Sequence, residues 1–179
     1  MATDILVMGI GNDLRGDDRV GLVLARAIRA RQLPHVRVVE CDGDITTWLL
    51  LWASSDTVVM LDAVVSGSEP GALHQLDVSD DPLPAAHRSP SSSHVLDVGQ
   101  IVELARTLHR LPRRLLVFGV EGKDFGHGTD ISPAVLAALP ATITAVVRAI
   151  NAITPEYAEA NAQQKKTAGN KSPAVGYIG

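Results

Sequence analysis

Short apolar segments and segments of helical periodicity alternate along the N-terminal part of the chain. Residues 5–8 form an unbroken apolar run, typical of a strand buried on both faces of a parallel sheet. Residues 36–41 are a second strand candidate, and residues 57–61 are a further β-branched apolar run. Apolar positions at helical spacing over 20–28 predict an amphipathic helix. Residues 48–52 are apolar all round and predict a helix packed on more than one side, with Asp44 as its N-cap. This order predicts a β-α-β-α-β unit with right-handed crossovers, the start of a doubly wound α/β sheet.

The C-terminal half has a looser pattern. Residues 71–78 alternate apolar and polar positions, which predicts an edge strand that runs antiparallel, and residues 115–120 predict a further buried strand. Helical spacing over 98–108 predicts an amphipathic helix. Ser132 and Pro133 are a good start for another helix, in which Pro140 predicts a kink.

The periodic pattern also suggests where the domain ends. It is lost after residue 153, where Ala, Asn, Gln, Lys and Gly dominate. We therefore predict one domain over residues 1–153, followed by a flexible C-terminal tail over residues 154–179.

Composition and charge narrow the function classes. The net charge is −4 and no basic block occurs, which argues against nucleic acid as a partner. No apolar run reaches the ~18 residues of a membrane span, so we expect no membrane insertion. The single Cys41 cannot form an internal disulfide and the chain opens without a basic-then-apolar leader, so a cytoplasmic protein is expected.

Candidate chemistry lies where the predicted parallel strands end, because ligands of open α/β sheets bind beyond the carboxyl ends of the strands. The first strand is followed by a segment that ends in Asp17 and Asp18, the second by Asp42-Gly43-Asp44, and the third by Asp62. Carboxylates that meet in one crevice repel one another. Such a cluster needs a cation, a shared proton or wide spacing.

One interpretation is a dinucleotide site, because Gly9-x-Gly11 follows a strand and precedes a helix. The third glycine of that fingerprint is replaced by Leu14, and the carboxylates of Asp17 and Asp18 would repel a phosphate at the helix start. Glu40 or Asp42 could still bind a ribose. A dinucleotide-binding, Rossmann-like oxidoreductase therefore stays an alternative.

A second interpretation is a metal site formed by Asp18, Asp62 and His94, with His127 as the next candidate. Two carboxylates and an imidazole leave open positions on a divalent ion, which suits zinc, nickel or manganese. Each residue also has a purely structural explanation, as a helix cap, a turn residue or a loop histidine. Their joint position at neighbouring strand ends favours a site.

The motifs resemble those of the nickel–iron hydrogenase maturation proteases. The resemblance rests on the segment from Gly9 to Gly21, on Asp42-Gly43, on Leu61-Asp62-Ala63, on Ser93-His94 and on Gly119-Val120, and it covers roughly residues 4–152. It implies a three-layer α/β/α fold of the phosphorylase/hydrolase-like class, with a mixed, mostly parallel five-stranded sheet. It also implies an endopeptidase that removes a C-terminal extension from the nickel-loaded large-subunit precursor of a hydrogenase.

The resemblance further implies roles for individual residues. Asp18, Asp62 and His94 correspond to the metal-binding and catalytic residues, with nickel contributed by the precursor, or another divalent metal such as zinc. The segment Asp42-Gly43-Asp44 corresponds to a substrate-recognition motif that is usually Asp-Gly-Gly, so Asp44 is a departure.

Two mechanisms and one further function stay open at this point. The peptidase is either metal-assisted or of the aspartic type, with Asp18 and Asp62 sharing a proton. A non-catalytic chaperone that binds the precursor is the other alternative. A monomer is expected.

Overall fold

The computed structural model describes residues 5–41, 44–79 and 98–169, with residues 155–169 described by their backbone alone. Its centre is a five-stranded sheet of order β2-β1-β3-β5-β4. The strands are β1 (Ile5–Ile10), β2 (Val36–Cys41), β3 (Thr57–Val64), β4 (Leu73–Asp77) and β5 (Arg114–Glu121). All pairings are parallel except that of β4 with β5. The predicted mixed, mostly parallel sheet and its antiparallel edge strand are confirmed.

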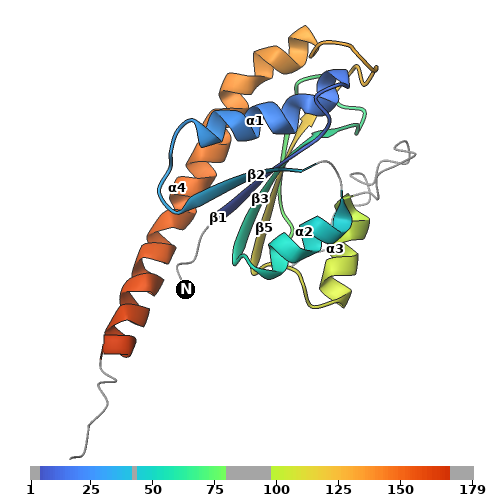
Figure 1. The fold of residues 1–179 in the computed structure, drawn as a ribbon. Helices are drawn as coiled ribbons and strands as arrows, with labels where there is room; N and C mark the ends of the chain where they lie inside the picture. The colour runs from blue at the N-terminus through green and yellow to red at the C-terminus, as the bar shows by residue number, and fades with distance from the viewer. Residues whose placement is uncertain (1–4, 42–43, 80–97, 170–179) are drawn as a thin grey trace, which may run out of the picture.

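Helices cover both faces of this sheet (Figure 1). The 3-10 helix η1 (Gly16–Arg19) leads into α1 (Val20–Arg29), which lies with α4 (Pro133–Gly169) on one face. The other face carries α2 (Ile45–Ala53) and α3 (Val98–Thr107). The three-layer α/β/α architecture is therefore confirmed.

Strand β1 contributes to the core on both of its faces. Ile5 and Val7 pack in the cluster formed with α1 and α4, whereas Leu6 and Met8 pack in the cluster formed with α2 and α3. Successive side chains of a strand point to opposite faces, so a strand between two helical layers needs an unbroken apolar run. This is why the sequence of β1 predicted its position so directly.

The helix α2 differs from its prediction. Trp48 and Trp52, one turn apart, are its fully buried residues, and Leu50 is 63% exposed. The prediction that it packs on more than one side is wrong, because a helix in the outer layer meets the sheet with one stripe only. Its predicted N-cap is confirmed, since the Asp44 carboxylate accepts the Thr46 N–H at 3.1 Å.

The glycines of β1 and of the segment that follows it serve close backbone packing. A Cβ at Gly9 would lie 2.4 Å from that of Ala25, and one at Gly21 would lie 2.2 Å from the carbonyl oxygens of Ile10 and Leu61. The start of α1 therefore lies directly on the ends of β1 and β3. A Cβ at Gly11 would lie 1.8 Å from the Asp18 carbonyl oxygen, so close packing explains both glycines of Gly9-x-Gly11 without a phosphate ligand.

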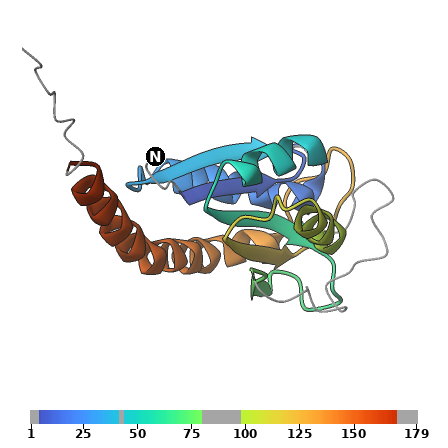
Figure 2. The ribbon, with the colours of Figure 1, turned by 90° about the horizontal axis from the view of Figure 1, so that it is seen from below.

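Helix α4 is longer than predicted and extends beyond the sheet (Figure 2). It passes through Pro140 and continues to Gly169, so the expected loss of regular structure after residue 153 is wrong for residues 154–169. Ala, Glu, Gln and Lys have high helix propensity even without an apolar period, which explains the difference. The predicted boundary between domain and tail stays a prediction.

The first part of α4 also has the length and composition of a membrane-spanning helix. Among the described residues, Pro133–Thr154 is the one segment with these features. Val135, Val146, Ile150 and Ile153 of this segment are nevertheless buried in the core cluster that includes α1. The length and composition of this segment therefore fit a core helix as well as a membrane span.

Candidate active site

Two of the predicted site residues meet at the carboxyl edge of the sheet. Asp62 lies inside β3, opposite Gly119 of β5, and not in the turn expected after the strand. Asp18 lies in η1, which contacts β3. Both residues are half-buried. The structure thus brings together two acids that are far apart in the sequence.

The two acids interact electrostatically. Burial, together with the nearby charge of Asp18, raises the pKa of Asp62 to about 8, against the opposing effect of the Ala63 N–H, which donates at 2.7 Å. Burial also raises the pKa of Asp18, against the attraction of Arg15. Near neutral pH one proton is therefore held on the pair, mainly on Asp62. Such a pair can act as acid and base, or bind a cation in place of the proton.

Of the remaining predicted site residues, only Asp44 lies in the part of the chain that the structure describes. His94, Asp42 and Gly43 lie outside the described residues. Asp44 is described, and its carboxylate is engaged as the cap of α2. Within residues 5–41, 44–79 and 98–169, no group of three or more His, Cys, Asp or Glu side chains is placed to hold a metal ion. The metal triad stays a prediction.

Asp17 differs sharply from its neighbour Asp18. Its side chain is fully buried and accepts three backbone N–H groups, from Lys123 at 2.7 Å, Asp124 at 2.9 Å and Ser132 at 2.7 Å. Burial alone would raise the pKa of Asp17, but these bonds outweigh it and lower the pKa. Neither Asp17 nor Asp18 caps α1, because the N-cap of that helix is Arg19. The carboxylate of Asp17 instead binds the loop between β5 and α4.

A second buried carboxylate, that of Glu121, was missed by sequence reasoning. It ends β5, is 2% exposed and accepts the N–H groups of Ser66 and Gly67 at 2.8 and 2.9 Å. His74 of β4 is partly buried, and its Nε2 lies 3.2 Å from the Glu121 carboxylate. An apolar run that ends in Glu is the only sequence signal for this acid.

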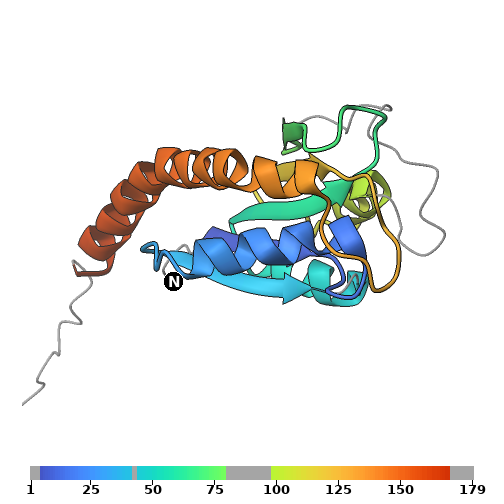
Figure 3. The same cartoon turned by 90° about the horizontal axis from the view of Figure 1, so that it is seen from above.

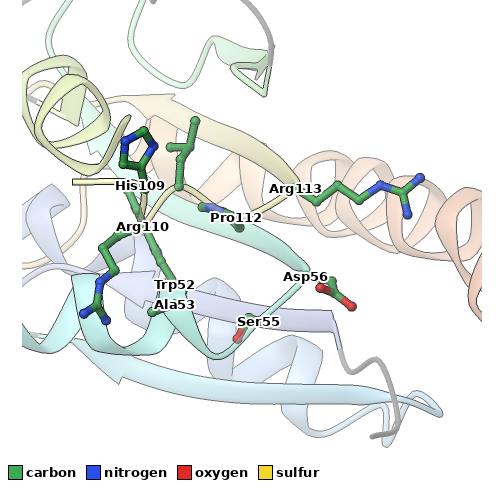
Figure 4. A pocket seen from close by; sticks show the side chains of 9 residues that line it. Trp52, Ala53, Ser55, Asp56, His109, Arg110, Pro112 and Arg113 are labelled. Atoms are coloured by element: carbon green, nitrogen blue, oxygen red, sulfur yellow. The ribbon is translucent and has the colours of Figure 1, made fainter. Parts of the chain in front are cut away.

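The described pocket lies at the opposite end of the sheet from Asp62. It has a volume of about 370 Å³ and is bordered by residues that precede β3 and β5, among them Asp56 and Arg113. Figure 4 shows Arg110 and Arg113 of this pocket pointing away from each other. Its charged groups do not converge on one point, so we assign it no ligand.

The chain is similar to proteins of one family throughout its domain. A model of the hydrogenase maturation protease family matches residues 21–149. The hydrogenase 2 maturation protease of Escherichia coli is 27% identical over 149 residues, which are 82% of this chain and 90% of that protein. The hydrogenase expression/formation protein HupD of Bradyrhizobium diazoefficiens is 29% identical over 135 residues, covering 73% of this chain and 69% of that protein.

Solved structures show the same fold. The hydrogenase maturating endopeptidase HybD from Escherichia coli superposes with a TM-score of 0.70 at 24% identity, over 83% of this chain and 92% of that chain. The maturation protease HybD from Thermococcus kodakarensis gives a TM-score of 0.62 at 22% identity, over 81% of this chain and 97% of that chain. None of these similarities favours an oxidoreductase.

Proposed function

Because the chain belongs to the hydrogenase maturation protease family, whose members remove the C-terminal extension of a large-subunit precursor, we propose that Asp18 and Asp62 carry out this cleavage. The observation that carries the proposal is the interaction of the two acids at the carboxyl edge of the sheet. A peptidase needs a group that takes a proton from the attacking water and a group that gives one to the product.

The electrostatics of the pair support a division of these two roles. Burial raises the pKa of Asp18 against the attraction of Arg15, and in this proposal Asp18 accepts a proton from the water that attacks the scissile carbonyl carbon. Asp62, whose pKa is raised to about 8, holds a proton and donates it to the carbonyl oxygen. When the C–N bond breaks, the proton on Asp18 passes to the leaving amine, and one hydroxyl proton of the intermediate returns to Asp62. The peptide bond and one water thus become a carboxylic acid and an amine.

Nickel enters as cargo of the precursor in a metal-assisted alternative, in which the cation takes the place of the proton on the pair and Asp62 no longer acts as the proton donor. Carboxylate oxygens of Asp18 and Asp62 and the imidazole of His94 are donors that a divalent transition metal accepts. A cation would also relieve the repulsion between the two acids. A precursor that carries nickel would therefore be held at the site, and an unloaded one would not.

Mass spectrometry of the precursor tests the function. The purified protein is mixed with nickel-loaded and with nickel-free precursor, and the mass of the product is measured. We expect loss of the C-terminal extension from the loaded precursor only. Cleavage of both at a similar rate would leave the aspartic mechanism and remove the role of nickel. A stable complex without any change of mass would instead favour the chaperone. The cytoplasmic location and the monomeric state stay predictions.

A further inference from the structure

Asp17 directly precedes Asp18, to which we assign a catalytic role, so its contacts bear on how Asp18 is held in place. Its carboxylate points away from the Asp18–Asp62 pair, into the loop of residues 122–132. Both of its oxygens are engaged, Oδ2 by Lys123 and Asp124 and Oδ1 by Ser132. Its own N–H donates to the Asp124 carbonyl at 2.7 Å. One residue thus makes four hydrogen bonds to a segment more than a hundred positions away.

Further contacts join the same two segments, which lie side by side in Figures 1 and 3. They are the Gly128 N–H to the Leu14 carbonyl at 2.7 Å, the Arg19 guanidinium to the Thr129 carbonyl at 3.0 Å, the Arg15 Nε to the Phe125 carbonyl at 3.3 Å, and a backbone bridge between Arg15 and His127. The segment that carries Asp18 is therefore fixed from one side by this loop.

The packing at Gly16 is correspondingly tight. This residue has a φ of +36°, and a Cβ there would lie 2.3 Å from the Asp124 carbonyl oxygen. The backbone of η1 and the loop touch directly, so a change in one displaces the other.

The carboxylate of Asp18 itself accepts no hydrogen bond from the residues that the structure describes. Its position must be set by the backbone that carries it. That backbone is held by Asp17, the preceding residue, and by a single turn of 3-10 helix in which the Asp18 N–H bonds the Arg15 carbonyl at 2.9 Å.

We propose that Asp17 is a positioning residue for the cleavage, which holds Asp18 against Asp62 by anchoring η1 to the loop of residues 122–132. This inference rests on the proposed function of the pair. Asp17 itself touches neither substrate nor reacting atoms. Its contribution is the fixed placement of its neighbour, and misplacement of a reacting group by about 1 Å is enough to slow catalysis markedly.

Glu121 provides a matched control, because it is also a buried carboxylate held by backbone N–H groups at the same edge of the sheet. It anchors the turn at Ser66 and Gly67 and not η1. Asp17→Asn and Glu121→Gln each remove one charge and turn one acceptor into a donor that faces N–H groups. If burial and charge alone matter, the two variants should behave alike.

The experiment compares kcat and KM of both variants with wild type on nickel-loaded precursor, per folded molecule. For Asp17→Asn we expect kcat to fall at least about tenfold with KM within about twofold. For Glu121→Gln we expect a loss of melting temperature comparable to that of Asp17→Asn, with kcat within about twofold of the wild-type value. Equal kcat losses in the two variants, or an unchanged kcat in Asp17→Asn, would overturn the proposal.

Amide hydrogen exchange separates this inference from the proposed function. Asp17→Asn should reduce protection of the Asp18, Lys123 and Ser132 amides, and Glu121→Gln should not. Unchanged protection at Asp18 would remove the positioning role whatever the activity. A wild-type protein that leaves the loaded precursor intact would remove the proposed function, and this inference with it. If Asp17→Asn does not fold, Arg19→Lys loosens the same loop at Thr129 and should lower kcat at least about threefold; an unaltered kcat would count against the proposal.

Discussion

The carboxyl edge of the sheet contains two kinds of buried acid. Asp17 and Glu121 are almost wholly removed from water and are surrounded by backbone N–H donors. Asp18 and Asp62 are less buried and receive fewer donors, with one from Ala63 to Asp62. The more buried acids have lowered pKa values, and the less buried ones have raised pKa values.

The difference shows that hydrogen-bond donors decide whether the effect of burial on the pKa of these acids is offset. Removal from water disfavours a carboxylate, and two or three N–H bonds more than offset that cost. Acids with such bonds stay charged and fix loops in place. Acids without them have raised pKa values, and Asp62 can hold a proton near neutral pH, as acid–base catalysis requires.

Removing the acids with raised pKa values should have the largest effect on activity. We expect Asp62→Asn and Asp18→Asn each to reduce cleavage by about 10²–10⁴-fold, because proton transfer is lost. Product mass over time measures this. The melting temperature of neither variant should fall below that of wild type, since neither side chain anchors a loop. Unfolding of either variant would instead make that acid structural.

The stability of Asp62→Asn should depend on pH in a direction fixed by the raised pKa. The folded-state pKa is about 8, against an ordinary value of 3.8, so the wild type loses stability as pH rises from about 4 through 8. Asparagine does not titrate. We therefore expect the melting temperature of Asp62→Asn relative to wild type to increase between pH 5 and pH 9. A constant difference over that range would show that Asp62 is ionised throughout.

Glu121→Gln should reduce stability to an intermediate extent. The pH dependence of its effect should be opposite to that of Asp62→Asn. Burial alone would raise the pKa of Glu121, but the donors at Ser66 and Gly67 and the charge of His74 lower it. The stabilisation is therefore full above the unfolded-state pKa near 4.5 and is lost as pH falls through the folded-state value. At pH 7 we expect a loss of about 2 kcal/mol in urea unfolding. The loss of stability should become smaller below pH 4. A loss as large at pH 3 as at pH 7 would mean that the packing of Glu121, and not its charge, is responsible.

Asp13→Asn should have the smallest effect on the stability of the protein. Asp13 pairs with Arg26 and its pKa is lowered by that hydrogen bond, yet its side chain is 48% exposed. Exposed ion pairs contribute below about 1 kcal/mol and are screened by salt. Urea unfolding at low and high salt should give a difference from wild type within that limit. A larger difference would mean that an ion pair contributes substantially to stability even when it is exposed.

Sequence reasoning succeeded where a single element carries the whole signal. The unbroken apolar runs of β1 and β3, the alternation of β4 and the Asp44 cap each follow from local periodicity or capping chemistry. It also placed Asp18 and Asp62 at one edge, because parallel strands end on the same side.

Sequence reasoning failed where residues distant in the sequence decide how buried a side chain is and which groups it bonds to. Asp17 and Asp18 are the same residue type in adjacent positions, and nothing local tells them apart. Leu50 is exposed although it lies in an apolar stretch, and His74 is partly buried although it lies among polar residues. The helix beyond residue 153 was missed because it lacks a periodic apolar face.

The amino-acid sequence by itself determined the layers of this protein and which acids reach the carboxyl edge of its sheet. Only the tertiary structure decided which of those acids stay charged and which hold a proton. The physical reason is that the N–H groups around Asp17 come from Lys123, Asp124 and Ser132, up to 115 positions further along the chain. Hydrogen-bond donors at that distance become neighbours only when β5 and the start of α4 pack against the rest of the fold.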